Sequence, residues 1–247
     1  MPQTDIPAAA RGAVPAPPRH EKLNPRAAGI VALAVLGSRV LGLVRDQVFG
    51  SLFGAGEFMD AFQMAFRIPN LLRDLFAEGA LSTAFITVFS KTSATEGDEA
   101  AWALANKVAS AAAVVVSLLT IIGIVCAPWI VTVIAHGFPP AKAALTVTLV
   151  RIMFPFILLV SLAALVMGML NAKNVFGIPA TASSFFNLGS IIAGVGIGWL
   201  IDPHFGPRAI LGLAFGTLVG GAMQLAVQLP SLKRLGHRFR PDFHWQI

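Results

Sequence analysis

The sequence predicts an all-α integral membrane protein with about six transmembrane helices, and three observations lead to this fold class. Of the 247 residues, 56% are hydrophobic and only 12% are charged, whereas a soluble domain carries about 25% charged residues. The apolar residues gather in six runs, and one bilayer crossing needs about 20 of them. The runs lack the apolar/polar alternation of β-barrel strands. A soluble domain of this length and a transmembrane barrel are therefore excluded.

The expected helices differ in whether charged residues or prolines interrupt their apolar sequence. They cover residues 27–50, 58–90, 105–135, 143–171, 178–201 and 208–230. The third, fifth and sixth contain a central run without charges, long enough to span about 30 Å of hydrocarbon at about 1.5 Å per residue. The second carries charges throughout and Pro69 in its middle, which is expected to kink it. The fourth holds Arg151 near its start and Pro155 one turn later.

The segments that flank these helices set the expected topology. Residues 1–24 are rich in Ala and Pro and predict a disordered tail. Residues 25–235 form the expected transmembrane lobe, and residues 236–247 a cytoplasmic end. With the N-terminus inside, eleven Lys and Arg residues fall on the inner side and only Lys142 and Arg208 on the outer side. This bias predicts that both termini are cytoplasmic.

Several chemistries are not indicated by the sequence. The single cysteine, Cys126, excludes an intramolecular disulfide. His136, His204 and His237 lack metal-ligand spacing. There is no phosphate loop, nucleophile elbow or dinucleotide fingerprint. We therefore expect neither an enzyme nor a cofactor nor a metal site. The net charge of +6 flanks apolar runs and predicts membrane orientation, not a nucleic-acid partner.

The informative region lies in the first two expected helices, where charges interrupt apolar sequence. Insertion of a lone ion at the bilayer centre costs about 2.5–3.5 kcal/mol, so such helices normally face a partner or a water-filled cavity. Asp60, Arg67 and Asp74 are seven residues apart and Glu78 follows four later, which places them within about 40° of one another on a helix. The full set of charges is Arg39, Arg45, Asp46, Asp60, Arg67, Arg73, Asp74 and Glu78.

Two interpretations of these charges remain open from the residues alone. Four arginines and four carboxylates balance to zero, so all eight could be ion pairs that hold two helices together. Alternatively, they could line a hydrophilic cavity for a polar or charged substrate, and arginine suits phosphate because its planar fork donates two parallel bonds. Arg39 precedes Asp46 by seven residues, so one pairing could satisfy both.

Two long blocks of sequence resemble a known family. They are SRVLGLVRDQVFGSLFGAG at 38–56 and DAFQMAFRIPNLLRDLFAEGALSTAF at 60–85, and both are similar to the start of the MurJ/MviN lipid II flippases. The likeness continues at residues 127–129, 151–171, 178–180 and 228–236. It implies one lobe of a V-shaped, MATE-like transporter that alternates between inward-open and outward-open states.

The resemblance also implies a substrate and its ligands. Family members move lipid II, the undecaprenyl-diphosphate-linked peptidoglycan precursor, across the bacterial inner membrane. The family's cavity arginines correspond to Arg39, Arg45 and Arg73 as substrate-binding residues. The resemblance assigns a cavity or gate role to Ser38, Asp46, Asp60, Arg67, Asn70, Asp74 and Glu78. Alternatives are an exporter of another lipid-linked oligosaccharide or of drugs on the same fold, and a non-transporting membrane scaffold.

Family members continue into a second lobe, whereas this sequence stops after six expected helices. Because alternating access needs one lobe to move against another around a shared site, we expect a truncated or half-length form. It would not flip lipid alone and would need a C-terminal lobe or a second copy of itself. Lipid II and membrane lipids are the other expected partners.

Overall fold

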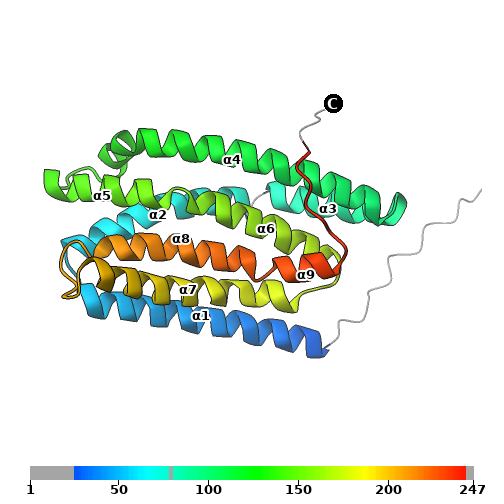
Figure 1. The fold of residues 1–247 in the computed structure, drawn as a ribbon, viewed down its shortest axis with the longest axis horizontal. Helices are drawn as coiled ribbons and strands as arrows, with labels where there is room; N and C mark the ends of the chain where they lie inside the picture. Colours follow the sequence, from blue (N-terminus) through cyan, green and yellow to red (C-terminus); the bar gives the residue numbers. More distant parts are fainter. Residues whose placement is uncertain (1–24, 78–79, 243–247) are drawn as a thin grey trace, which may run out of the picture.

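The computed structural model describes residues 25–77 and 80–242, without the side chains of 25–28, 72–77 and 80–83. The predicted tail and Glu78 lie outside this description. Within it, every regular element is a helix (Figure 1). The helices are α1 (Pro25–Phe53), α2 (Glu57–Ala77), α3 (Ala80–Thr95), α4 (Asp98–Ile134), α5 (Pro140–Met153), α6 (Phe156–Ala172), α7 (Gly177–Ile201), α8 (Ile210–Ala226) and α9 (Leu229–Arg234).

Two expected helices are each divided into two elements, the fourth into α5 and α6 and the sixth into α8 and α9. The second is described as α2 and α3, which lie on either side of residues 78–79, outside the described part. The break between α5 and α6 falls at Pro155, which has no backbone N–H to continue the helical ladder. Pro230, in the first turn of α9, likewise lacks the backbone N–H that would bond to the Ala226 carbonyl at the end of α8. Proline chemistry therefore sets both of these divisions.

The prediction of an all-α membrane protein is confirmed. Four helical segments of the described chain are long and apolar enough to span a membrane: Asp98–Ile134, Pro140–Ala172, Gly177–Ile201 and Ile210–Arg234. Large apolar side chains stand on the outside, such as Val125, which is 69% exposed, and Leu200, which is 73% exposed. Exposed apolar side chains are compatible with contact with lipid tails. The backbone polar groups are compatible as well, because they are hydrogen-bonded within the helices.

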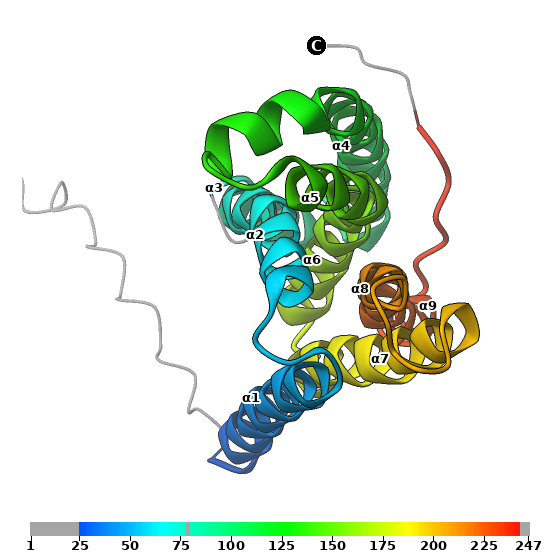
Figure 2. The ribbon, with the colours of Figure 1, turned by 90° about the vertical axis from the view of Figure 1, so that its left-hand side faces the viewer.

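The helices form two groups when viewed end-on (Figure 2). In one group, α1 packs along α7 and α7 packs along α8. The other group contains α2 to α6, and α8 joins the groups by packing on α5 and α6. The main core cluster spans both groups and includes Phe49, Phe62, Leu149, Phe154 and Leu213. Because α1 packs far more on α7 than on α2, the two charged helices are left apart.

The seam between α7 and α8 is the closest helix packing in the lobe, and glycines allow it. A Cβ atom on Gly216 would lie 2.5 Å from Cα of Gly194, and one on Gly198 would lie 3.1 Å from the carbonyl oxygen of Ala209. Small residues at membrane helix interfaces let backbones approach in this way. The seam holds α7 in a fixed position against α1.

Candidate functional site

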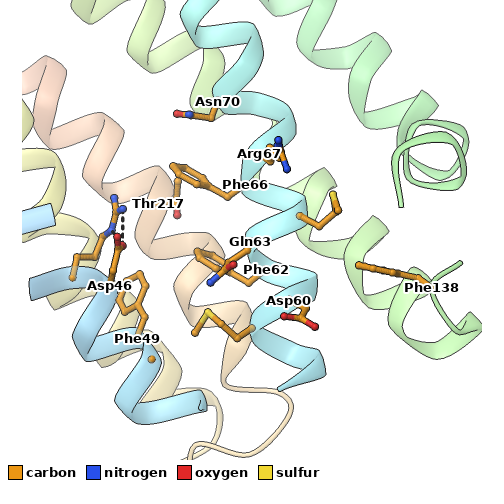
Figure 3. Close-up of a pocket in the computed structure, with 14 residues that line it drawn as sticks. Asp46, Phe49, Asp60, Phe62, Gln63, Phe66, Arg67, Asn70, Phe138 and Thr217 are labelled. Atoms are coloured by element: carbon orange, nitrogen blue, oxygen red, sulfur yellow. Dashed lines mark hydrogen bonds and ion pairs between the residues drawn. The ribbon is translucent and has the colours of Figure 1, made fainter. Parts of the chain in front are cut away.

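A cavity of about 720 Å³ opens between α1 and α2, with Thr217 of α8 at its back (Figure 3). Its volume lies in the range of about 300–1,000 Å³ that is usual for ligand pockets. It is lined by Arg45, Asp46, Phe49, Gly50, Met59, Asp60, Phe62, Gln63, Met64, Phe66, Arg67, Asn70, Phe138 and Thr217. One wall thus comes from α1 and the other from α2.

The guanidinium of Arg45 is held from several directions on the α1 wall. Its Nε and Nη2 donate to Oδ1 of Asp46 at 3.0 and 2.8 Å. Its Nη1 donates to Oδ1 of Asn187 at 3.1 Å. The Cζ atom lies 5.9 Å from the ring centre of Phe66 and 5.6 Å from that of Phe186, close enough for cation–π attraction. The side chain is only 18% exposed, so its cation is fixed at the cavity.

Asn187 of α7 connects this arginine to the helix frame. Its Nδ2 donates to the Ser38 carbonyl oxygen at 3.0 Å while its Oδ1 accepts from Arg45. The residue is buried, at 7% exposure. Gly42 of α1 lies next to it, since a Cβ atom there would be in van der Waals contact with Asn187 Nδ2 at 3.6 Å. Sequence reasoning missed Asn187, although a lone amide in an apolar, glycine-rich run was the available signal.

The α2 wall presents polar side chains at helical spacing. Asp60, Gln63, Arg67 and Asn70 recur every three or four residues, so they share one face. Arg67 is exposed and makes no ion pair with any residue the structure describes. The buried Oδ1 of Asn70 likewise has no hydrogen-bond partner within the described ranges. The guanidinium of Arg67 is therefore available to a ligand in the cavity, and Asn70 contributes an amide whose oxygen is unsatisfied.

One end of the cavity is marked by an ion pair between α2 and α5. Nζ of Lys142 donates to Oδ2 of Asp60 at 2.9 Å. The ammonium also lies 4.1 Å from the ring centre of Phe138. Lys142 is 12% exposed and Asp60 is 60% exposed, so the lysine is held and the carboxylate faces the cavity. Lys142 was expected only as an outer-loop charge, and its role here had no local signal in the sequence.

The remaining predicted site residues are placed differently. Arg39 is exposed and does not line the cavity. Asp46 pairs with its neighbour Arg45 and not with Arg39, which lies about two helical turns away. Ser38 takes part through its carbonyl oxygen. The side chains of Arg73 and Asp74 lie outside the described part, as does Glu78. The cavity therefore gathers five of the predicted residues: Arg45, Asp46, Asp60, Arg67 and Asn70.

The chemistry of the cavity combines cations with aromatic surface. The rings of Phe62 and Phe66 stack with their centres 6.3 Å apart, and in Figure 3 they lie between Asp46 of α1 and Arg67 of α2. Across the described ranges no three His, Cys, Asp or Glu side chains are grouped to hold a metal ion. The arrangement suits an anionic group that enters beside an apolar one.

Comparison with known proteins assigns this architecture to a family. The profile of the family described as lipid II flippase MurJ matches residues 49–247. The chain belongs to the MurJ family. A probable lipid II flippase MurJ from Buchnera aphidicola subsp. Acyrthosiphon pisum is 39% identical over 217 residues, covering 87% of this chain and 42% of that protein. The lipid II flippase MurJ of Burkholderia cenocepacia is 40% identical over 200 residues, covering 80% and 38%.

A solved MurJ structure in an inward closed conformation has the same fold in its matching part. It superposes with a TM-score of 0.68 at 27% sequence identity, over 85% of this chain and 42% of that chain. The predicted resemblance to MurJ and its transporter-lobe architecture are thus confirmed. The chain spans about 40% of the length of the MurJ relatives it matches, which are covered to 42% and 38%.

Proposed function

We propose that this chain forms one lobe of a lipid II flippase, in which the α1–α2 cavity receives the diphosphate headgroup of the undecaprenyl-linked peptidoglycan precursor. The observation that carries the proposal is the fixed guanidinium of Arg45 at the wall of a 720 Å³ cavity. Preorganised donors bind a charged group without a further ordering cost. An arginine fork matches phosphate oxygens in geometry as well as charge.

The geometry suggests how the headgroup is bound. Asp46 is 65% exposed, so its bond to Arg45 can be exchanged for a phosphate oxygen at little cost. Arg67 supplies a second cation from α2, and the amide of Asn70 can hydrogen-bond a sugar or peptide group. The undecaprenyl tail stays in lipid while the polar part crosses. The lobe thereby stabilises the polar headgroup, whose transfer into hydrocarbon is unfavourable.

Transport requires movement of this lobe against another around the shared site. We propose that a C-terminal lobe or a second copy supplies the other wall, and that the headgroup passes from the cytoplasmic to the periplasmic leaflet of the bacterial inner membrane. Both termini are cytoplasmic in this scheme. No bond in the lipid is made or broken, so the chain acts as a transporter and not as an enzyme.

A pure ion-pair scaffold would fill the space between α1 and α2 with mutually satisfied charges. Two observations favour transport instead. The cavity is open, and within the described residues Arg67 has no carboxylate partner. The substrate-binding roles of Arg39 and Arg73 rest on the family resemblance, because one side chain lies outside the cavity and the other outside the described part.

Complementation tests the proposal. Residues 25–242 replace the matching segment of the Burkholderia cenocepacia MurJ in a bacterium depleted of its own MurJ. We expect the hybrid to restore growth, Arg45→Ala to abolish rescue, and Arg45→Lys to restore it only in part, since an ammonium cannot form the fork. Arg208→Ala, an exposed charge outside the cavity, is the matched control and should rescue fully. Full rescue by Arg45→Ala at normal membrane abundance would refute the proposal.

A further inference from the structure

We infer that the lobe carries a binding site for an anionic phospholipid on the outer side of α4, where the segment after α9 crosses that helix (Figure 1). The site is separate from the α1–α2 cavity and does not depend on the proposed transport. It consists of an apolar groove for an acyl chain and three cations for the phosphate: Lys107, Arg238 and Arg240.

The segment after α9 is fastened to α4 by polar contacts at regular intervals. Asn106 Nδ2 donates to the Arg238 carbonyl oxygen at 3.4 Å, and the Arg240 N–H donates to Asn106 Oδ1 at 3.4 Å. The N–H of Asp242 donates to Ser110 Oγ at 3.1 Å. The ring of His237 lies 3.0 Å from Asn106 Oδ1 through Nε2. The segment therefore forms a fixed wall beside the helix.

A groove of about 510 Å³ lies between this wall and α4. Its lining is almost entirely apolar and consists of Ser110, Ala113, Val114, Ser117, Leu118, Ile121, Phe239 and Pro241. The α4 members recur at spacings of three and four, so they form one stripe along the helix. This groove belongs to the candidate membrane span Asp98–Ile134. An acyl chain can enter it sideways from the bilayer.

Cations stand at one end of the same stripe. Lys107 precedes Ser110 by three residues and Val114 by seven, so it continues the stripe toward the start of α4. Arg238 and Arg240 lie at the same end, because their backbone groups bond to Asn106, four residues before the groove residue Ser110. All three basic side chains are exposed. None pairs with a carboxylate that the structure describes.

The charge balance decides which lipid fits. Asp242 is the carboxylate of the same segment, so three cations against one carboxylate leave an excess of positive charge beside an apolar groove. A phosphodiester with net negative charge complements this excess, whereas a zwitterionic headgroup gains little. Each basic residue near an anionic lipid surface favours binding by about fivefold. The order of cations, then groove, matches the order of phosphate, then acyl chain.

Native mass spectrometry of the whole chain tests the site. The purified protein is exposed to equimolar dioleoyl phosphatidylglycerol and dioleoyl phosphatidylcholine, which differ only in headgroup. We expect the first to be retained at least fivefold over the second, with the preference falling as salt screens the charges. Excess glycerol 3-phosphate should not displace it, because the acyl chain is part of the ligand.

Two sets of variants separate this site from general charge attraction. Lys107→Gln/Arg238→Gln/Arg240→Gln should bring the two lipids close to parity. The control Lys91→Gln/Arg208→Gln/Lys233→Gln removes three exposed charges elsewhere and should keep the preference. Ser117→Phe fills the groove with every charge in place and should lower retained phosphatidylglycerol several-fold. Equal retention of both lipids by the wild type, equal loss in both triple variants, displacement by glycerol 3-phosphate, or undiminished binding by Ser117→Phe would each overturn the inference.

Discussion

The α7–α8 seam and the α1–α2 opening are two helix pairs in one lobe with opposite packing. In the seam, glycines such as Gly194 and Gly216 bring the helix backbones together. In the opening, charged and aromatic side chains keep the helices apart around a cavity. Small residues allow close helix packing in a membrane protein, whereas large side chains keep two helices apart. The tight pair fixes a frame, and the loose pair leaves room for a polar ligand.

Asn187 is where the two regions meet. It belongs to α7, which the seam holds, and its side chain bonds both Ser38 and Arg45 of α1. The guanidinium at the cavity is thus oriented by a helix that does not itself line the cavity. Substitutions in the α7–α8 seam and substitutions at the α1–α2 opening should therefore have different consequences.

The largest expected effect comes from adding one methyl group to the seam. Gly216→Ala places a Cβ 2.5 Å from Gly194 Cα, and the backbone must separate, at a cost of about 1–3 kcal/mol or more. Thermal unfolding in detergent should show a clear loss of stability. Gly37→Ala on α1 is the matched control, since its Cβ meets open space and alanine favours helix by about 1 kcal/mol. Equal stability of the two variants would show that the seam is not tight.

An intermediate effect is expected from the link between the regions. Asn187→Leu removes one hydrogen bond to a charged group and one to a carbonyl, and we expect a loss of about 1–3 kcal/mol. In a double-mutant cycle with Arg45→Ala, the two losses should be less than additive, because they share one contact. Asn187→Gln, which keeps the amide but lengthens the side chain, controls for polarity. Strict additivity would mean that Asn187 does not orient Arg45.

A small effect is expected from the ion pair at the end of the opening. Asp60 is 60% exposed, so solvent screens its bond to Lys142, and the coupling in an Asp60→Asn/Lys142→Gln cycle should stay below about 1 kcal/mol. The coupling should shrink further at high salt. A salt-independent coupling of several kcal/mol would contradict the solvent screening that we assign to this pair.

The smallest effect is local and depends on pH. Burial lowers the pKa of His237 from its ordinary value of 6.5, so the folded state favours the neutral ring. The contribution of His237 to the free energy of unfolding is therefore fully present above about pH 6.5. It is lost as the pH falls through the lowered pKa of the folded state. Hydrogen exchange should show residues 237–242 loosening from α4 in acid, while the seam is unchanged. His237→Gln should remove the pH dependence.

The sequence predicted the charged residues of the cavity better than the residues of other helices that contact them. Asp46, Asp60 and Arg67 were identifiable because a charge inside an apolar helix is costly and must face something polar. Thr217 and Phe186 were not, since they lie on other helices more than a hundred residues away and resemble ordinary packing positions. Asn187 is just as distant in the sequence, and its only signal was an amide within an apolar, glycine-rich run. Hydropathy likewise predicted the membrane helices but not the break at Pro155, where local proline chemistry overrides the apolar run.

The central claim is that the α1–α2 opening binds a diphosphate through Arg45, while the seam only supports it. Microscale thermophoresis of the purified chain with undecaprenyl diphosphate tests this most directly. We expect Arg45→Ala to weaken binding at least tenfold, corresponding to loss of a charge-assisted hydrogen bond of about 1.5–3 kcal/mol. Arg208→Ala, which does not line the cavity, should bind like the wild type. Unchanged affinity of the Arg45→Ala variant would contradict the account.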